Sequence, residues 1–168
     1  MGSDAVASPN EAAIRGFRET DLVAVARLIQ RTIDASYSGV YPFRAVQFFK
    51  EFHSPAKIME RHRQGDLLVV EREGRLIATG AIVGADIFGV FVDPEFQRCG
   101  YGGSLMSELD TKAKARGFTA SKLSVSLPSV SFYQTLGYDM LEKCSIDVGA
   151  GQSLIFWKAR KPLTASEA

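Results

Sequence analysis

The spacing of hydrophobic residues in the first third of the chain predicts helices. Hydrophobic residues recur at helical spacing at Leu22, Val25, Leu28 and Ile29. This pattern predicts an amphipathic helix from about residue 22 to 33, with Thr20 as its N-cap. Residues 36–42 carry a glycine and a proline, which predicts a loop, and two further helices are expected at residues 43–52 and 55–64.

Short runs of strand-forming residues, bounded by turn residues, dominate the rest of the chain. Strands are expected at residues 13–18, 67–73, 75–83, 85–92, 118–126, 138–148 and 153–160. An amphipathic helix is expected at residues 100–116 and a short one at 128–136. This order of elements predicts an α/β domain with a mixed sheet.

Length, charge and cysteine content narrow the class of protein. The 168 residues suit one domain, expected at residues 13–163, with flexible tails at 1–12 and 164–168. Twenty basic and 19 acidic residues leave a net charge of +1, which argues against nucleic acid or an anionic membrane as the main partner. Only two cysteines are present and no apolar run is long enough to span a bilayer, so a cytoplasmic protein without a structural metal is expected.

A glycine-rich turn, residues 97–103, lies between an expected strand and an expected helix. A helix start offers unpaired N–H groups and a partial positive charge, and glycines allow close approach, so the turn can hold a phosphate. A P-loop would need Lys followed by Ser or Thr, and a dinucleotide fold would need a third glycine where Leu105 stands. A loop whose glycines only permit tight packing remains the alternative.

Two motifs resemble those of the GNAT superfamily of acetyl-coenzyme A-dependent N-acetyltransferases. The first is V-D-P-E-F-Q-R-C-G-Y-G at Val92–Gly102, and the second is S-F-Y-Q-T-L-G-Y at Ser131–Tyr138. The resemblance implies a mixed, mostly antiparallel twisted sheet of six to seven strands with four to five helices. It also implies that strands splay apart at the site of acetyl-CoA, the co-substrate.

The resemblance assigns roles to individual residues. It implies cofactor contacts at Val90, Phe91, Val92, Gln97, Arg98, Cys99, Gly100, Tyr101, Gly102, Gly103, Ser126, Ser129, Phe132 and Tyr133. Backbone groups of Val90 and Val92 would pair with the pantetheine arm, and the turn at 97–103 would hold the pyrophosphate. Ser126 stands where the family often has an asparagine, so an amide contact to the cofactor is replaced or lost.

Transfer from a thioester to an amine needs a proton donor and a base. Tyr133 is the expected donor to the leaving thiolate, and an aromatic residue that only packs is the alternative. Asp86 is the expected base, since strand alternation would place it on one apolar face with Phe88, Val90 and Val92. A solvated turn residue is the competing interpretation of Asp86.

The acceptor is expected to be a small-molecule or peptide amine. The resemblance implies that its pocket is built in the region where Tyr37, Tyr41, Phe43, Phe48 and Phe49 cluster, with Tyr37, Tyr41 and Phe43 as expected lining residues, although core packing would also explain these aromatics. His53 and His62 are expected to be surface or packing residues. The sequence thus predicts an N-acetyltransferase acting through a ternary complex. A non-catalytic acyl-CoA sensor and an O-acyl or longer-acyl transferase are the alternatives, and assembly as a homodimer is left open.

Overall fold

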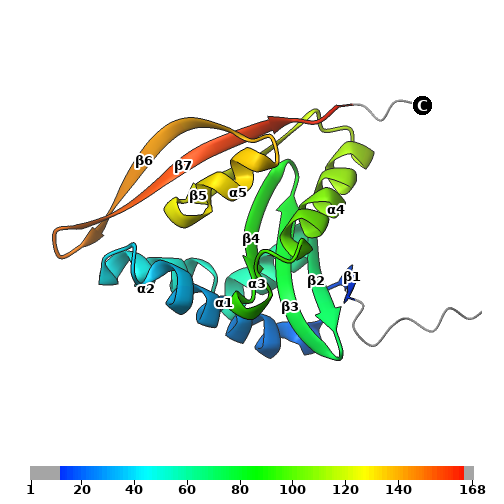
Figure 1. Ribbon diagram of the computed structural model, residues 1–168, viewed down its shortest axis with the longest axis horizontal. Coiled ribbons are helices and arrows are strands. Elements are labelled where there is room, and N and C mark those ends of the chain that lie inside the picture. Colours follow the sequence, from blue (N-terminus) through cyan, green and yellow to red (C-terminus); the bar gives the residue numbers. More distant parts are fainter. Residues whose placement is uncertain (1–11, 165–168) are drawn as a thin grey trace, which may run out of the picture.

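The computed structural model describes residues 12–164, which form a twisted seven-stranded sheet with helices on both faces (Figure 1). The strands are β1 (Ala12–Gly16), β2 (Asp66–Arg72), β3 (Arg75–Val83), β4 (Asp86–Val92), β5 (Ala120–Ser126), β6 (Asp139–Gly149) and β7 (Gln152–Pro162). Their order across the sheet is β1-β2-β3-β4-β5-β7-β6, and every neighbouring pair is antiparallel except β4 and β5. The mixed, mostly antiparallel sheet predicted above is therefore confirmed.

Helices cover the two faces of the sheet and divide the core into two clusters. The helices are α1 (Leu22–Tyr37), α2 (Phe43–Phe52), α3 (Pro55–Gln64), α4 (Tyr101–Ala115) and α5 (Val130–Thr135). Side chains of α1 to α3 form one buried cluster with one face of the sheet, and side chains of α4 and α5 form a second cluster with the other face. The β6–β7 hairpin extends beyond the β1–β4 part of the sheet toward α2 (Figure 1).

Two details of the first helix differ from the prediction. α1 continues to Tyr37 because the buried stripe goes on past Ile33 to Tyr37, one helical turn later. The prediction of Thr20 as N-cap is wrong. A short 3₁₀ turn precedes the helix, and the Asp21 carboxylate, which accepts the Arg18 N–H at 2.8 Å, supports that turn.

The segments expected to be tails, residues 1–12 and 164–168, lie outside the described residues apart from Ala12 and Thr164. Ala12 already belongs to β1, where it pairs with Arg72 of β2.

A bulge in β4 changes which residues face which side of the sheet. Ala81 pairs with Phe88 and Thr79 with Phe91, so two residues of β4, Gly89 and Val90, oppose the single Gly80 of β3. Gly89 adopts the left-handed conformation, with φ of 60°, that such a bulge requires. Phe88 and Phe91 consequently pack with the helices α1 to α3, whereas Val90 and Val92 pack on the opposite face.

The sheet opens next to this bulge. β4 and β5 pair only at Asp86 with Lys122 and at Ile87 with Leu123, and beyond these pairs the two strands diverge. The splayed strands expected at the cofactor site are therefore present in the structure, and the opening joins the two faces of the sheet.

Candidate functional site

A cavity of about 530 Å³ lies on the α2 side of the sheet and reaches the opening between β4 and β5. Its apolar wall combines aliphatic side chains, such as Leu141, Ile146 and Leu154, with six phenylalanines, namely Phe48, Phe49, Phe52, Phe88, Phe91 and Phe156. Polar residues lie at the opening, where Ser126, Ser129 and Tyr133 line the cavity. Charged side chains line it elsewhere, namely Asp86, Lys122, Lys158 and Arg160. An apolar cavity with few polar groups is the usual form of a small-molecule site.

Tyr133 is buried on α5 and lines the cavity. Its ring meets those of Phe132 and Tyr138 at centroid distances of 4.9 and 5.7 Å, which fixes its orientation. Burial raises the pKa of the Tyr133 hydroxyl well above its usual value, and the nearby Tyr37 and Tyr138 add to the effect. Within residues 12–164 this hydroxyl has no hydrogen-bond partner, so a neutral phenol is free to act on a ligand at the opening.

Three hydroxyl groups form a polar row in the same part of the cavity. Ser126 Oγ donates to the Tyr37 hydroxyl at 2.9 Å and lies 3.0 Å from Ser129 Oγ. Burial raises the pKa of Tyr37 above its usual value, although its bonds to the two serines oppose this effect. Ser126, Ser129 and Tyr37 are thereby brought together, as the sequence-based assignments to one site require.

The other two aromatics assigned to the acceptor pocket lie outside the cavity. The Tyr41 hydroxyl accepts the Leu127 N–H at 2.8 Å and donates to the Ile155 carbonyl at 2.7 Å, so it ties the start of the α5 region to β7. Phe43 is 68% exposed and forms no part of the cavity wall. Of the three residues, the structure brings only Tyr37 to the cavity, where it lies with Phe48 and Phe49 of the same predicted cluster.

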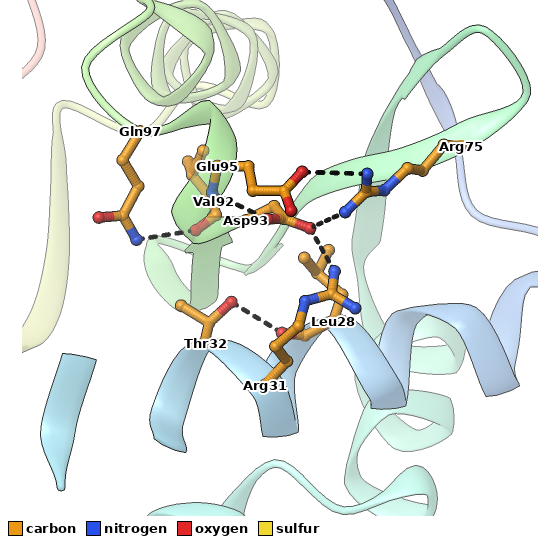
Figure 2. A network of polar contacts seen from close by, with 8 residues as sticks. All are labelled: Leu28, Arg31, Thr32, Arg75, Val92, Asp93, Glu95 and Gln97. Carbon is orange, nitrogen blue, oxygen red and sulfur yellow. Dashed lines mark hydrogen bonds and ion pairs between the residues drawn. The ribbon is translucent and has the colours of Figure 1, made fainter. Parts of the chain in front are cut away.

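Asp93, directly after β4, anchors the turn that leads to α4 (Figure 2). Its buried carboxylate pairs with Arg31 and, at 2.9 Å, with Arg75, and it accepts the Glu95 N–H at 3.0 Å. Burial opposes ionisation of Asp93, but the Glu95 N–H and then the two arginines outweigh it, so the pKa of Asp93 lies below its usual value. Sequence reasoning missed this network, because Arg31 and Arg75 come from distant elements.

The same turn sets the backbone at the end of β4. The Asp93 N–H donates to the Ile77 carbonyl at 2.8 Å, so strand alternation directs the N–H and C=O of Val92 toward the opening. The Val92 carbonyl accepts Gln97 Nε2 at 3.0 Å (Figure 2), which leaves the N–H as the group available to a ligand.

The residues at the start of α4 have the conformation expected of an anion-binding turn. Arg98 and Gly100 both have positive φ, 63° and 89°, and Cys99 is exposed. The first-turn N–H groups of α4, at residues 101–103, have no acceptor within the helix. A Cβ on Gly102 would lie 3.0 Å from Phe132, whereas a Cβ on Gly103 would meet nothing within 4 Å.

Asp86 lies at the mouth of the cavity, in a setting unlike the one predicted. It shares a face with Phe88, but the bulge turns Val90 and Val92 to the opposite face, so the predicted apolar face is wrong beyond Phe88. The Asp86 side chain is 53% exposed and lies 4.0 Å from Lys122 Nζ. It remains the one carboxylate that lines the cavity within the described residues.

His53 is part of the cavity wall, which the sequence analysis did not predict. The residue follows α2, is 7% exposed, and packs edge-on against Phe52 and Phe91. Its Nδ1 lies 2.8 Å from Arg61 NH1 of α3. No local sequence signal marks this pair, because it depends on how α2 and α3 meet. His62, in contrast, packs against Phe17 at 5.0 Å, in the packing role expected.

The fold and the two motifs together define an acetyltransferase architecture, a mixed sheet opened between two parallel strands beside a glycine-rich helix start. A model of the acetyltransferase (GNAT) family matches residues 26–138, more than half of the chain. The chain belongs to this family. A sequence search against curated proteins gives no significant match.

The chain superposes on solved structures of acetyltransferases and putative acetyltransferases. A GCN5-related N-acetyltransferase from Rhodopseudomonas palustris superposes with a TM-score of 0.81 at 20% identity, over 90% of this chain and 95% of that chain. The PaiA N-acetyltransferase from Thermoplasma acidophilum, in complex with coenzyme A, gives 0.73 at 19% identity over 90% and 99%. YncA from Salmonella typhimurium, a putative acetyltransferase with its cofactor acetyl-CoA, gives 0.65 at 17% identity over 95% and 98%. These identities establish the fold alone.

Two further kinds of feature are absent from residues 12–164. No helix within residues 12–164 is long and apolar enough to cross a membrane. No group of three or more His, Cys, Asp or Glu side chains in that part of the chain is arranged to hold a metal ion.

Proposed function

We propose that the protein transfers an acetyl group from acetyl-CoA to an amine within a ternary complex. One observation carries this proposal: the opening between β4 and β5 joins the donor-rich start of α4 on one face to the cavity on the other, with Tyr133 at the junction. Two ligands that approach from opposite faces of the sheet can meet at such an opening.

The residues at the start of α4 fit the phosphates of coenzyme A. Gly100 and Gly102 let the backbone approach an anion closely, and Arg98 adds a positive charge beside the free N–H groups. The diverging backbone of Val90 and Val92 would hold the pantetheine arm. Acetyl-CoA, when bound, supplies the acetyl thioester.

The remaining chemistry falls to this chain's own side chains. The neutral Tyr133 hydroxyl can give its proton to the departing thiolate. The Val92 N–H can donate to the carbonyl oxygen as negative charge builds on it. Asp86, at the mouth of the cavity, can take the proton of an incoming ammonium group directly or through a water molecule.

The experiment that tests this function measures release of free thiol from acetyl-CoA over a panel of aliphatic amines, amino acids and peptides. We expect release that depends on both acetyl-CoA and one class of acceptor, with the acetylated amine found by mass spectrometry. Binding of coenzyme A without release for any acceptor would reject the proposal.

A further inference from the structure

Arg61 is a buried cation with no carboxylate partner in residues 12–164. Its side chain donates to His53 Nδ1 at 2.8 Å and to the Phe52 carbonyl at 2.8 Å, and it packs over the rings of Phe52 and Phe88. The neighbouring acid Glu60 points to Lys57, at 3.4 Å. Although burial lowers the pKa of Arg61 to about 10, the guanidinium is charged at neutral pH.

Arg61 fixes the tautomer of His53. A guanidinium can only donate, so Nδ1 of His53 accepts and the proton of the neutral ring is on Nε2. Burial and the charge of Arg61 lower the pKa of His53 to about 3, so the ring is neutral at physiological pH. His53 is therefore a hydrogen-bond donor and cannot serve as the base.

The donor is held rigidly at the cavity wall. The His53 ring meets Phe52 and Phe91 at 5.0 and 4.9 Å, nearly perpendicular to both, and Phe91 in turn lies 6.3 Å from Tyr37. His53 lines the cavity, and Nε2 has no partner within the described residues. Because Tyr37 belongs to the hydroxyl row at the opening, a small ligand can reach both His53 and the reaction site.

The charge around the cavity favours an anionic ligand group. Lys122, Lys158 and Arg160 line it together with one acid, Asp86. Lys122 lies 4.0 Å from Asp86 and Lys158 lies 3.9 Å from Glu142, whereas Arg160 has no ion pair within residues 12–164. Arg61, also without a carboxylate partner there, lies directly behind His53. A buried charge without a counter-ion is unfavourable, and an anion placed at His53 would compensate it. The phenylalanine-rich wall requires that the rest of the ligand be apolar.

We propose that the acceptor is an amine that also carries a carboxylate and an apolar side chain, and that His53 Nε2–H, backed by Arg61, binds the carboxylate. The inference rests on the proposed function only in calling this ligand the acceptor. Binding of the carboxylate at His53 does not require that the protein catalyses a reaction. The α-amino acids with aromatic or branched side chains are the class that fits.

The test compares binding of matched pairs to protein saturated with coenzyme A, by isothermal titration calorimetry. L-phenylalanine is paired with phenethylamine and L-leucine with isoamylamine, so that each pair differs only by the carboxylate. We expect the amino acid of at least one pair to bind about 10- to 100-fold more tightly, the range of a charge-assisted hydrogen bond. Equal binding within both pairs, or no binding of either amino acid, overturns the inference.

Variants assign the effect to His53. His53→Phe keeps an aromatic ring without nitrogens and should bring the affinity ratio within a pair close to one, and His53→Gln, which restores a donor, should recover part of it. His62→Phe, at the other histidine, is the matched control and should keep the wild-type ratio. Bound coenzyme A and an intact melting transition show that His53→Phe is folded. An unchanged ratio in His53→Phe assigns the carboxylate elsewhere and overturns the proposal.

Turnover separates this inference from the proposed function. If thiol were released equally fast with the amino acids and with the matching amines that lack the carboxylate, the acetyltransferase proposal would stand and the inference would be overturned. If the amino acids bound selectively but no acceptor caused thiol release, the carboxylate site at His53 would stand and the acetyltransferase proposal would be overturned.

Discussion

Burial favours the uncharged forms of the three aromatic polar residues of the cavity, Tyr37, Tyr133 and His53. It does so in opposite directions, since removal from water raises the pKa of the phenols and lowers that of the imidazole to about 3. Tyr133 therefore carries a proton that it can donate, and the neutral ring of His53, whose Nδ1 faces Arg61, can donate a hydrogen bond from Nε2. Within the described residues, only Asp86 brings a carboxylate to the cavity, which is why the proposed base role falls on it.

Replacement of Tyr133 by Phe tests the proton donor. Tyr133→Phe should lower kcat by about 10²- to 10⁴-fold, the usual contribution of a general acid, while the affinity for coenzyme A is retained. Because the pKa of Tyr133 is raised, its ionisation should cause no alkaline loss of activity below about pH 10. The rate of thiol release measures kcat, and isothermal titration calorimetry measures the affinity for coenzyme A. Wild-type turnover in the variant would show that Tyr133 only packs.

The base role of Asp86 is tested with a strongly basic acceptor. Asp86→Asn should lose most activity at pH 7 and recover part of it as pH rises, because more of the amine is then already neutral. The measurement is the pH dependence of kcat/KM for both proteins. Asp86 is half exposed and lies near Lys122, as a surface residue without a catalytic role would. In that case the pH profiles of wild type and Asp86→Asn would coincide.

At the scale of elements, the bulge in β4 organises the site more than any single side chain does. It turns Phe88 and Phe91 toward the cavity and Val90 and Val92 toward the opposite face. Gly89 also leaves room for Arg61, since a Cβ there would lie 2.9 Å from Arg61 NH1.

Gly89→Ala should therefore destabilise the protein by about 2 kcal/mol or more. A left-handed conformation costs a residue with Cβ about 1–2 kcal/mol, and the contact with Arg61 adds an overpacking cost. Urea unfolding measures the difference. Gly39→Ala is the control, because its Cβ would meet nothing within 4 Å and its φ is not positive, so a change within about 0.5 kcal/mol is expected. Equal effects of the two substitutions would contradict the argument.

The turn after β4 depends on Asp93, and this gives its stability a pH dependence. The pKa of Asp93 is lower in the folded state than in the unfolded chain, so its contribution is complete above about pH 4 and is lost as pH falls through the folded pKa. Asp93→Asn removes the charge that pairs with Arg31 and Arg75 and should cost about 3 kcal/mol at pH 7.

Urea unfolding at pH 7 and at pH 3 checks this prediction. The difference between wild type and Asp93→Asn should shrink at pH 3, and coenzyme A should bind the variant more weakly at pH 7. Glu95→Gln, at an exposed partner of Arg75, is the control and should change stability by less than about 1 kcal/mol. An equal difference at both pH values would exclude the charge of Asp93 as the cause.

Periodicity predicted the elements well, and it failed where the chain departs from a regular period. The order of elements along the chain and the glycine-rich turn follow from local patterns, and the mostly antiparallel sheet was predicted from the family resemblance; the fold class and the position of α4 were correct. The bulge at Gly89 was not predicted, because F-G-V-F-V has the pattern of a regular strand, and Val90 and Val92 were therefore wrongly placed on the same face as Asp86. The pair formed by His53 and Arg61 depends on how two helices pack, which no local pattern contains.

At the scale of the whole molecule, the site exists only because both faces of the sheet meet at one opening. The α4 face offers backbone donors, and the α2 face offers an aromatic cavity. The turn after β4 is held by side chains of α1 and β3, and the cavity wall is formed by residues of several helices and strands. Ligand binding at the opening is therefore expected to stabilise the entire domain.

The last prediction concerns this stabilisation. Coenzyme A at 100 times its dissociation constant should add about 2.7 kcal/mol to the free energy of unfolding, which corresponds to a rise in Tm of about 5–10 °C for a chain of this size. Gly103→Asp should abolish most of the rise, since it brings a negative charge to the start of α4 at a position with open space around the Cβ. Gly102→Asp cannot test this, because its side chain would collide with Phe132 and destabilise the free protein as well. Gly103→Ala is the matched control and should keep the rise. If coenzyme A left Tm unchanged while ATP or NAD raised it, the turn would serve a different nucleotide and the acetyl-CoA proposal would fail.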